Sequence, residues 1–385
     1  MIEFSSRVTD VEPAAPIAIS NLVSDRIEDG ADIIDLGMGQ PDVETPDHII
    51  EATKNALDAG YTTYTPSDGI VELRRAIAAY LRDRFDLEYG AEHVIATPSG
   101  KLALFETIQT IVDRGDEVVL FDPAWSSYDP MVRMAGGTPV HVDLSSYDFA
   151  LEPAMADLDT ALSDDTALVV VNSPSNPSGM VFSEAALAGL RDLVVDYDVP
   201  VLSDEIYAEL IYEGEQRSLA TFDGMLERTI TINGFSKTFS MTGFRLGFMA
   251  APTEHVEMAG KVHTHSVSCA SNFVQRAGIA ALENTDIDAF TAGMMETFTA
   301  RRDLLVDLFA DRGVEVPVPQ GAFYAMVPIE ADDDMQWCLN AVTEAGVGLV
   351  PGAAFGTPGY VRASLIEPRE RIREGVARLA DAGFI

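Results

Sequence analysis

Residues 229–249 read TITINGFSKTFSMTGFRLGFM, and this stretch decides the fold. The apolar and β-branched residues at its two ends predict strands that enter and leave a turn-rich segment. Lys237 and Arg245 lie inside that segment. We expect burial among Phe235 and Phe239 to remove water from the lysine ammonium, which lowers the lysine pKa and leaves a nucleophilic amine.

A lysine and an arginine in one turn-rich segment suggest a specific chemistry. The lysine amine can form a Schiff base with a carbonyl, and the arginine guanidinium can clamp a phosphate with two parallel hydrogen bonds. Pyridoxal phosphate chemistry requires both groups. From these two residues alone, a surface lysine and a packing arginine on a loop are an equal alternative, so the rest of the chain has to distinguish the two interpretations.

The composition indicates a large protein with an extensive core. The chain has 385 residues, of which 47% are hydrophobic, so we expect two domains rather than one. It has neither an apolar run long enough to cross a bilayer nor a basic and apolar leader, which predicts a cytoplasmic protein without a membrane partner. Cys269 and Cys338 are too few for a disulfide framework.

The charge is strongly acidic. The formal net charge is -37, and only four of the 25 basic residues are lysines. Such a surface repels nucleic acid and anionic membranes, so neither is expected as a partner. Because molar salt shortens the range of this self-repulsion to about 3 Å, we interpret the charge as adaptation to a high-salt cytoplasm. An acidic protein of ordinary habitat is the alternative.

From Val94 to Met249 short apolar strands alternate with helices. This pattern predicts an α/β fold with a mostly parallel, seven-stranded sheet covered on both faces. From about residue 285 the alternation changes, which predicts a smaller α+β domain. We therefore expect a large domain at 45–286 and a small domain built from 1–44 and 287–385. The expected strands are HVIAT, EVVLF, TPVHV, ALVVV, VPVLS, TITIN and LGFMA.

Unusual residues follow several of these strands, where parallel sheets bind ligands. The turn containing Ser99, Gly100 and Lys101 opens a helix, whose free N–H groups suit a phosphate, although most such turns are only caps. Trp125 follows the second strand and could stack on a flat ligand or belong to the core. Asp204 directly follows an apolar strand, so it is either a buried carboxylate that needs a partner or a helix cap.

Other short patterns are weaker. Thr45 is predicted to cap a helix that has Pro46 at its first position. Gly37 and Gly39 do not form a dinucleotide fingerprint, because a proline follows where a helix should begin. The histidines at 263 and 265 do not share a helix face and have no evident partners, so no metal site is expected.

Taken together, the motifs GMGQPD, NSPSNPSG, SDEIY, SKTFSMTGFRLG and VRASL resemble fold type I, pyridoxal phosphate-dependent aminotransferases of the class that includes aspartate aminotransferase. The resemblance covers nearly the whole chain, with the motifs in the family's order. It implies transfer of an amino group between an L-amino acid and a 2-oxo acid, with aspartate or the glutamate/2-oxoglutarate pair as the expected substrates.

The resemblance also implies roles around the cofactor ring. Lys237 matches the lysine that forms the Schiff base and then moves a proton as general acid and base. Asp204 matches the aspartate that pairs with the pyridine nitrogen. Asn176 and Tyr207 match the pair that hydrogen-bonds the ring's phenolic oxygen, and Trp125 matches the stacked aromatic residue.

Further roles concern the phosphate and the substrate. Arg245 matches a phosphate ligand, together with Ser99, Gly100 and Lys101 at the helix N-terminus. Tyr64 matches the tyrosine that reaches the phosphate of a neighbouring subunit, which implies a homodimer with shared sites. Arg362 matches the arginine that binds the substrate α-carboxylate, and Gly39 matches a backbone contact beside it. Membership further implies cis peptides before Pro123 and Pro177.

Some positions depart from the family's pattern. Gly234 stands where some relatives have a serine or threonine that contacts phosphate. The arginine that in some subgroups crosses from the partner subunit to a distal substrate carboxylate cannot be located. We therefore hypothesise that Lys101 reads that carboxylate, the alternative being a solvated lysine.

The same motifs also fit other functions on this fold. They are an aromatic or alanine-type aminotransferase and a carbon–sulfur β-lyase, which uses the same lysine and aspartate. A non-catalytic effector-binding module is disfavoured, because Lys237, Asp204, Arg245 and Arg362 are all present.

Overall fold

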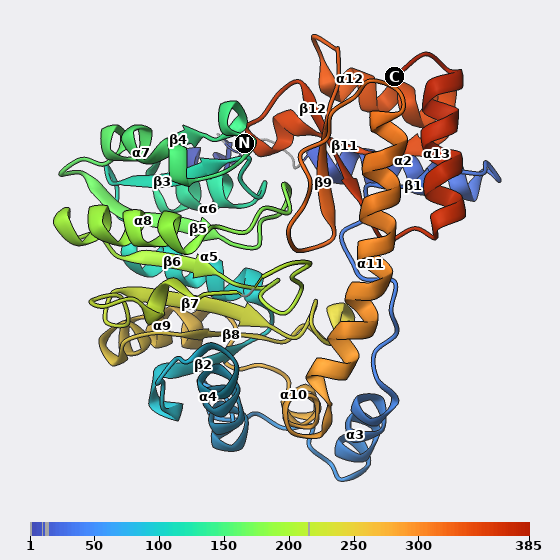
Figure 1. Ribbon diagram of the computed structural model, residues 1–385. Coiled ribbons are helices and arrows are strands. Elements are labelled where there is room, and N and C mark those ends of the chain that lie inside the picture. Colours follow the sequence, from blue (N-terminus) through green and yellow to red (C-terminus); the bar gives the residue numbers. More distant parts are fainter. Residues whose placement is uncertain (1, 10, 12–14, 215) are drawn as a thin grey trace.

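A seven-stranded sheet forms the larger part of the molecule, and its strands run mostly parallel (Figure 1). The computed structural model describes residues 2–9, 11, 15–214 and 216–385. β8 runs antiparallel to both of its neighbours, and the other pairs are parallel. The strand order is β2 (Val94–Thr97), β8 (Gly247–Ala250), β7 (Thr229–Gly234), β6 (Val201–Asp204), β5 (Thr166–Asn172), β3 (Glu117–Asp122) and β4 (Thr138–Asp143). The predicted seven-stranded, mostly parallel sheet is therefore confirmed.

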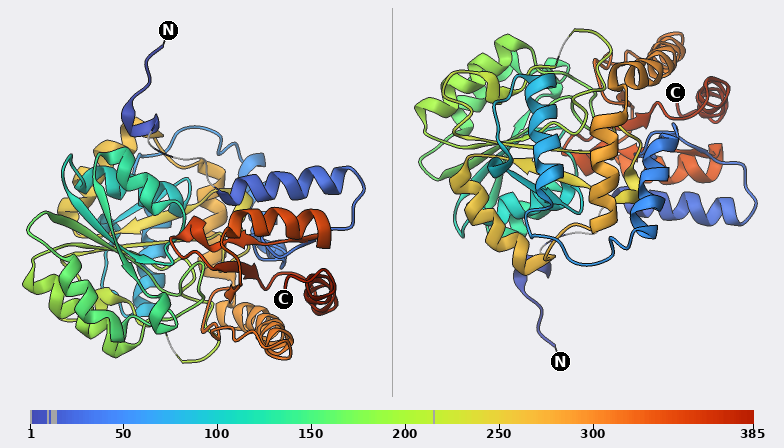
Figure 2. Two further views of the ribbon diagram at one scale, coloured as in Figure 1. Left: turned by 90° about the horizontal axis from the view of Figure 1, so that it is seen from above. Right: turned by 90° about the horizontal axis from the view of Figure 1, so that it is seen from below.

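Helices cover both faces of this sheet (Figure 2). Successive side chains of a strand point to opposite faces, so in β5 Leu168 and Val170 pack on one face while Val169 and Val171 pack on the other. The first face is covered by α5 (Gly100–Ile111), α6 (Tyr128–Ala135) and α9 (Thr253–Ser266). The other is covered by α7 (Met155–Ala161), α8 (Glu184–Asp196), α4 (Val71–Phe85) and α10 (Asn272–Asn284).

A second, smaller set of strands lies beside the large sheet, and we call it the small-sheet region. Its antiparallel strands follow the order β11 (Val350–Pro351), β12 (Tyr360–Ser364) and β9 (Tyr324–Pro328). The short β1 (Ile34–Asp35) pairs in parallel with β10 (Val347–Gly348). The helices around them are α2 (Ala15–Glu28), α11 (Ile287–Ala310), α12 (Asp334–Asn340) and α13 (Arg369–Asp381).

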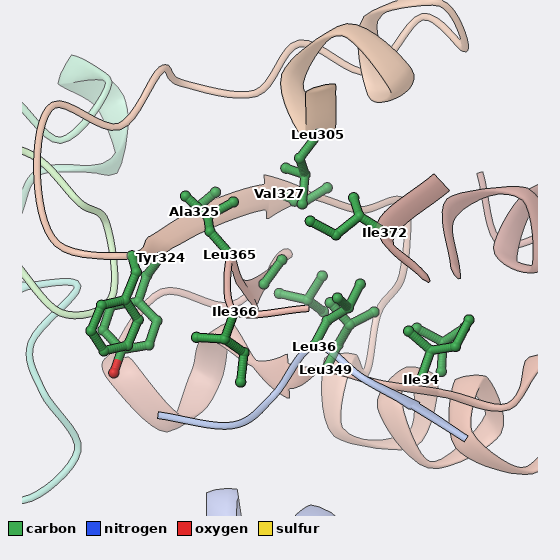
Figure 3. Close-up of a cluster of buried hydrophobic side chains, with 14 of the residues drawn as sticks. Ile34, Leu36, Leu305, Tyr324, Ala325, Val327, Leu349, Leu365, Ile366 and Ile372 are labelled. Carbon is green, nitrogen blue, oxygen red and sulfur yellow. The ribbon is translucent and has the colours of Figure 1, made fainter. Parts of the chain in front are cut away.

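The small-sheet region has its own apolar core (Figure 3). Ile34 and Leu36, from the beginning of the chain, pack in this core with Leu365 and Ile372 from its end. This packing explains why the N-terminal segment joins the C-terminal one. Tyr324 lies at the border of the cluster, and its hydroxyl oxygen points away from the aliphatic side chains (Figure 3).

Several local predictions can be compared with the structure. The peptides before Pro123 and Pro177 are cis as expected, and the peptide before Pro174 is also cis. The predicted cap at Thr45 is wrong. Helix α3 (Asp47–Asp58) begins one residue after Pro46 and has no side-chain cap, and the Thr45 hydroxyl instead donates to the Ser240 carbonyl. Of the predicted N-terminal part of the small domain, residues 1, 10 and 12–14 lie outside the described residues.

Candidate active site

A cavity of about 380 Å³ opens at the carboxyl ends of β3, β5, β6 and β7. It is the place where a parallel sheet is expected to bind a ligand. Both the large sheet and the small-sheet region contribute to its wall. The lining residues are Met38, Gly39, Gln40, Ser99, Gly100, Lys101, Leu104, Trp125, Tyr128, Asn172, Asn176, Asp204, Ile206, Tyr207, Ser236, Lys237, Thr242, Arg245, Tyr324 and Arg362.

Lys237 follows β7 and extends into this cavity. Burial and the nearby charges of Arg362 and Arg245 lower its pKa to about 7. Its ammonium donates to the Gly39 carbonyl. The expected surroundings were wrong in detail, because Phe235 and Phe239 pack in the core beneath the loop.

The aromatic rings nearest to the Lys237 ammonium come instead from Tyr207 and Phe323. The lysine nitrogen lies 5.9 Å from the first ring centroid and 5.5 Å from the second. Phe323 belongs to the small-sheet region, so the lysine is desolvated from two sides.

Asp204 is the last residue of β6 and is buried. Burial raises its pKa to about 6, opposed by hydrogen bonds from Tyr128 and the Ile206 amide. The Tyr128 hydroxyl donates to the Asp204 carboxylate at 2.6 Å. The carboxylate therefore has neutral donors, and its remaining capacity can accept a proton-bearing ring nitrogen of a ligand.

Arg362 is buried on β12 and reaches across to the large sheet. Its guanidinium donates to the Asn176 side-chain oxygen at 3.0 Å and to the Gly37 carbonyl at 2.6 Å. Burial lowers its pKa. Its Nε has no hydrogen-bond partner among the described residues. A guanidinium buried among neutral oxygens retains its affinity for a carboxylate.

Tyr207 contacts Asn176, the residue whose side-chain oxygen accepts from Arg362. Its hydroxyl lies 3.1 Å from the Tyr324 hydroxyl and accepts from the Asn176 amide at 3.5 Å. Burial and the neighbouring Tyr324 raise the pKa of Tyr207 well above its usual value. Tyr207 is therefore a neutral hydrogen-bond donor at physiological pH.

A candidate anion site lies where α5 begins. The first amides of a helix have no intrahelical acceptor and carry the positive end of the helix dipole. The Ser99 hydroxyl accepts from the Leu102 amide, so the Ser99 side chain caps the helix. Arg245, in the left-handed conformation with φ 55°, extends to the same cavity and bonds the Thr242 carbonyl.

Glycines allow β7, β8 and α5 to approach one another here. A Cβ on Gly247 would lie 2.2 Å from the Gly100 nitrogen, and one on Gly234 would lie 3.0 Å from the Gly247 Cα. A side chain at 234 would therefore require its neighbours on β8 and Ile206 to shift by a few tenths of an ångström.

Lys101 lies over the indole of Trp125, with its nitrogen 4.6 Å from the ring centroid. Desolvation and the Arg245 charge lower the pKa of Lys101. The structure shows no hydrogen bond or ion pair from this ammonium to a carboxylate of the described chain. Lys101 is therefore available to an anionic ligand.

Tyr64 is the predicted site residue that the structure leaves outside the cavity. Its side chain is 87% exposed on the loop between α3 and α4. The sequence interpretation missed Tyr128 and Asn172, which also line the cavity. A tyrosine on an amphipathic helix looks like a core residue, so Tyr128 gave no signal. Asn172 stood at the end of a strand and could have been considered with Asn176.

His263, one of the two histidines considered above for a metal site, is hydrogen-bonded within the fold. His263 is buried and bonds the Glu106 carboxylate at 2.9 Å. Across the described chain, no group of three or more His, Cys, Asp or Glu residues could hold a metal ion. Nor does that part of the chain contain a helix that is both long and apolar enough for a membrane span.

These observations fit pyridoxal phosphate. The cavity's cations and the free amides of the helix suit the phosphate of this cofactor, and the buried Asp204 suits its ring nitrogen. Because the pKa of Lys237 is lowered, its amine can be neutral and attack the carbonyl carbon of the cofactor. The cavity is also wide enough for the ring and a small substrate.

Comparisons with known proteins agree with this geometry. The family model "Aminotransferase class I and II" matches residues 31–379. A probable N-acetyl-LL-diaminopimelate aminotransferase of Bacillus subtilis is 38% identical, over 97% of this chain and 94% of its own. The aspartate/prephenate aminotransferase of Thermus thermophilus is 38% identical, over 98% and 97%. The structure of the Thermus thermophilus aspartate aminotransferase with maleate superposes with a TM-score of 0.95 at 37% identity, covering 99% of this chain and 100% of that one.

Proposed function

Because the chain belongs to the class I and II aminotransferase family, we propose that this pyridoxal phosphate-dependent enzyme transfers the amino group of L-aspartate to a 2-oxo acid. 2-Oxoglutarate is the proposed acceptor. The observation that carries the choice of substrate is Lys101, a cation in the cavity without a carboxylate partner among the described residues. The dicarboxylate maleate in the related Thermus structure supports the same choice.

The cofactor, when bound, supplies an electron-accepting ring that stabilises negative charge at the substrate α-carbon. We assign its phosphate to Arg245 and to the helix N-terminus at Ser99, Gly100 and Lys101. Asp204 holds the ring nitrogen. Trp125, which lines the same cavity, stacks on the ring.

Two hydrogen-bond donors serve the ring's phenolic oxygen. They are the Tyr207 hydroxyl and the Asn176 amide, which lie within 3.5 Å of each other. Both are buried, so they are fixed before the ligand arrives and need little reorganisation during the reaction.

Lys237 carries the proton during the reaction. With a pKa lowered to about 7, its amine is neutral in a large fraction of molecules near neutral pH. A neutral amine can accept the proton of the substrate α-carbon and return it as an ammonium. Burial of the lysine against Tyr207 and Phe323 excludes water that would compete for that proton.

The substrate is held by its two carboxylates. The α-carboxylate binds the Arg362 guanidinium, which donates two parallel hydrogen bonds to the carboxylate oxygens. The Gly39 backbone lies beside this position, and its carbonyl accepts from Lys237. The distal carboxylate of aspartate binds the Lys101 ammonium over Trp125.

A Lys101→Ala variant tests the substrate assignment. We expect kcat/KM for aspartate to fall about 10- to 100-fold, as for loss of a charge-assisted hydrogen bond, while kcat/KM for alanine stays nearly unchanged. Lys261→Ala, which removes an exposed lysine, is the matched control. An unchanged ratio of aspartate to alanine activity in Lys101→Ala would remove the basis for the dicarboxylate preference.

The assembly is proposed to be a homodimer with shared active sites. Tyr64 is 87% exposed, and its expected role requires a second chain. Tyr61, which is 40% exposed on the same loop, adds apolar surface for such a contact. Sedimentation of the enzyme as an active monomer would contradict this.

The cellular setting and the domain division are proposed on the sequence. The net charge of -37 favours a protein of a high-salt cytoplasm, which loses structure when salt is removed. The boundaries at 44/45 and 286/287 divide a large domain at 45–286 from a small domain at 1–44 and 287–385. The second boundary coincides with the beginning of α11 at Ile287.

A further inference from the structure

Residues 36–45 form a segment, here called the strap, that runs beside α11 from the small-sheet region towards α3 (Figure 1). Its first half is bonded to the small-sheet region. The Ser364 amide donates to the Leu36 carbonyl at 2.7 Å. The Arg362 guanidinium donates to the Gly37 carbonyl at 2.6 Å.

A buried arginine of α11 fixes the middle of the strap. Arg301 donates to both carboxylate oxygens of Asp42, at 2.9 and 2.7 Å. The same guanidinium donates to the Leu365 and Ile366 carbonyls, at 3.1 and 2.8 Å. Arg301 is 7% exposed, so this bidentate contact holds the strap in one place.

The second half of the strap reaches the loop that carries Lys237. The Thr45 hydroxyl donates to the Ser240 carbonyl at 2.6 Å, and these residues are 195 positions apart in the sequence. Lys237 itself donates to the Gly39 carbonyl. The strap therefore contacts the loop at two places, through Gly39 and through Thr45.

In the turn after Lys237, Ser240 makes only weak hydrogen bonds within the turn, while its neighbours Phe239 and Met241 are anchored in the core. Ser240 has φ 53°, a left-handed conformation that is strained for a residue with a side chain. Its amide reaches the Lys237 carbonyl only at 3.4 Å, and its buried hydroxyl has no partner among the described residues. The 2.6 Å bond from Thr45 is the shortest contact that fixes this turn.

We propose that Thr45 is a positioning residue of this aminotransferase, whose hydroxyl holds the strained turn at Ser240 and thereby fixes the direction of Lys237. The inference rests on the proposed role of Lys237. It adds that the position of the lysine is set by the strap, which is in turn fixed by Asp42 and Arg301. Nothing in the role of Thr45 requires contact with the substrate or the cofactor.

Three threonine variants test this proposal in the loaded enzyme. Thr45→Val removes the hydroxyl at nearly constant shape, and Thr45→Ser restores it. Thr160→Val is the matched control, because it removes an exposed threonine hydroxyl on α7 that bonds only within its helix. Each variant is measured for kcat/KM with aspartate.

A second readout follows the lysine directly. The enzyme is converted to its pyridoxamine form, in which the lysine amine is free, and amine labelling is followed by mass spectrometry across pH. The chain has only four lysines, so the labelled peptides are easily separated, and the exposed Lys54 is an internal reference. A purely structural contribution of Thr45 would lower stability without moving the labelling midpoint of Lys237.

We expect Thr45→Val to lower kcat/KM about tenfold, the effect of one lost buried hydrogen bond together with misplacement of the reacting group. We also expect the labelling midpoint of Lys237 to rise by about half a pH unit or more, because a loosened loop desolvates the amine less. Thr45→Ser and Thr160→Val should behave as the unchanged enzyme, and the Lys54 midpoint should stay constant.

The proposal is overturned if Thr45→Val keeps both the kcat/KM and the Lys237 midpoint of the unchanged enzyme. If Thr45→Val does not fold, the double variant Thr45→Val/Ser240→Gly takes its place, because glycine adopts the left-handed turn without strain. It should fold and recover part of the activity, and a double variant that also fails to fold would equally overturn the proposal. Turnover by Lys237→Ala would instead contradict the proposed function itself.

Discussion

Two groups of arginines in this protein have opposite surroundings. On the surface of the small-sheet region, Arg371 and Arg378 both bond the carboxylate of Asp32 and that of Glu374. Their hydrogen bonds lower the Asp32 pKa to about 2. In the cavity, Arg362 bonds only an amide oxygen and a backbone carbonyl, and burial lowers its pKa.

The difference shows which charges are available for binding. On the surface both arginines are paired with carboxylates, and water screens the charge that is left unpaired. In the cavity Lys101, Lys237, Arg245 and Arg362 line one space, and Asp204 is the single carboxylate among its described lining residues. Four cations facing one lining carboxylate leave an excess of positive charge in the cavity, which suits the phosphate and carboxylates of ligands.

The largest expected effect comes from replacing one arginine of each group with lysine. Arg362→Lys keeps the charge but loses the planar fork, so we expect kcat/KM to fall about 100-fold with every amino donor. Arg371→Lys is the matched surface change and should leave kcat/KM unaltered. Steady-state kinetics with aspartate and alanine checks both, and equal effects of the two variants would break the comparison.

A smaller effect concerns the pH dependence of Lys237. Since its pKa is lowered to about 7 and the neutral amine reacts with the cofactor, capture of pyridoxal phosphate by the cofactor-free protein should rise about tenfold per pH unit below 7 and level off above it. Stopped-flow absorbance between pH 5.5 and about 9 measures this profile. Capture that keeps rising to about pH 10 would mean that the lysine has its ordinary pKa and is not desolvated.

The smallest effect is expected from Tyr128→Phe. The Tyr128 hydroxyl lowers the Asp204 pKa against the effect of burial, so its removal should raise that pKa above about 6. The acidic limb of the kcat/KM profile should move to higher pH, and kcat should fall only about two- to tenfold. Tyr147→Phe, on an exposed tyrosine that also bonds an aspartate, is the control. An unmoved acidic limb would show that Tyr128 does not tune Asp204.

Much of this fold could be predicted because its signals are local. Each strand of the large sheet is a short apolar run, and helices between them follow the same periodicity, so the alternation was visible without long-range information. The residues after the strands pointed to the cavity for the same reason, since parallel strands bring their carboxyl ends together.

The rest depended on contacts between distant parts of the chain. Thr45 looked like a helix cap, which is the usual local role of a threonine before a proline, yet its hydroxyl bonds Ser240 from another part of the fold. Tyr128 looked like a core residue, yet its hydroxyl donates a hydrogen bond to Asp204 at the site. The prediction of which rings surround Lys237 was also wrong, because one of them, Phe323, belongs to the small-sheet region.

The most direct test is an absorption spectrum of the loaded enzyme in high salt, before and after addition of L-aspartate. Our account predicts that the pyridoxal band is replaced by the band of the pyridoxamine form and that 2-oxoglutarate restores the first band. Lys237→Ala, loaded with the same cofactor, should show neither change. A pyridoxal band that aspartate and glutamate leave unaltered, while alanine or an aromatic amino acid converts it, would contradict the assignment of Lys101 and the choice of substrate.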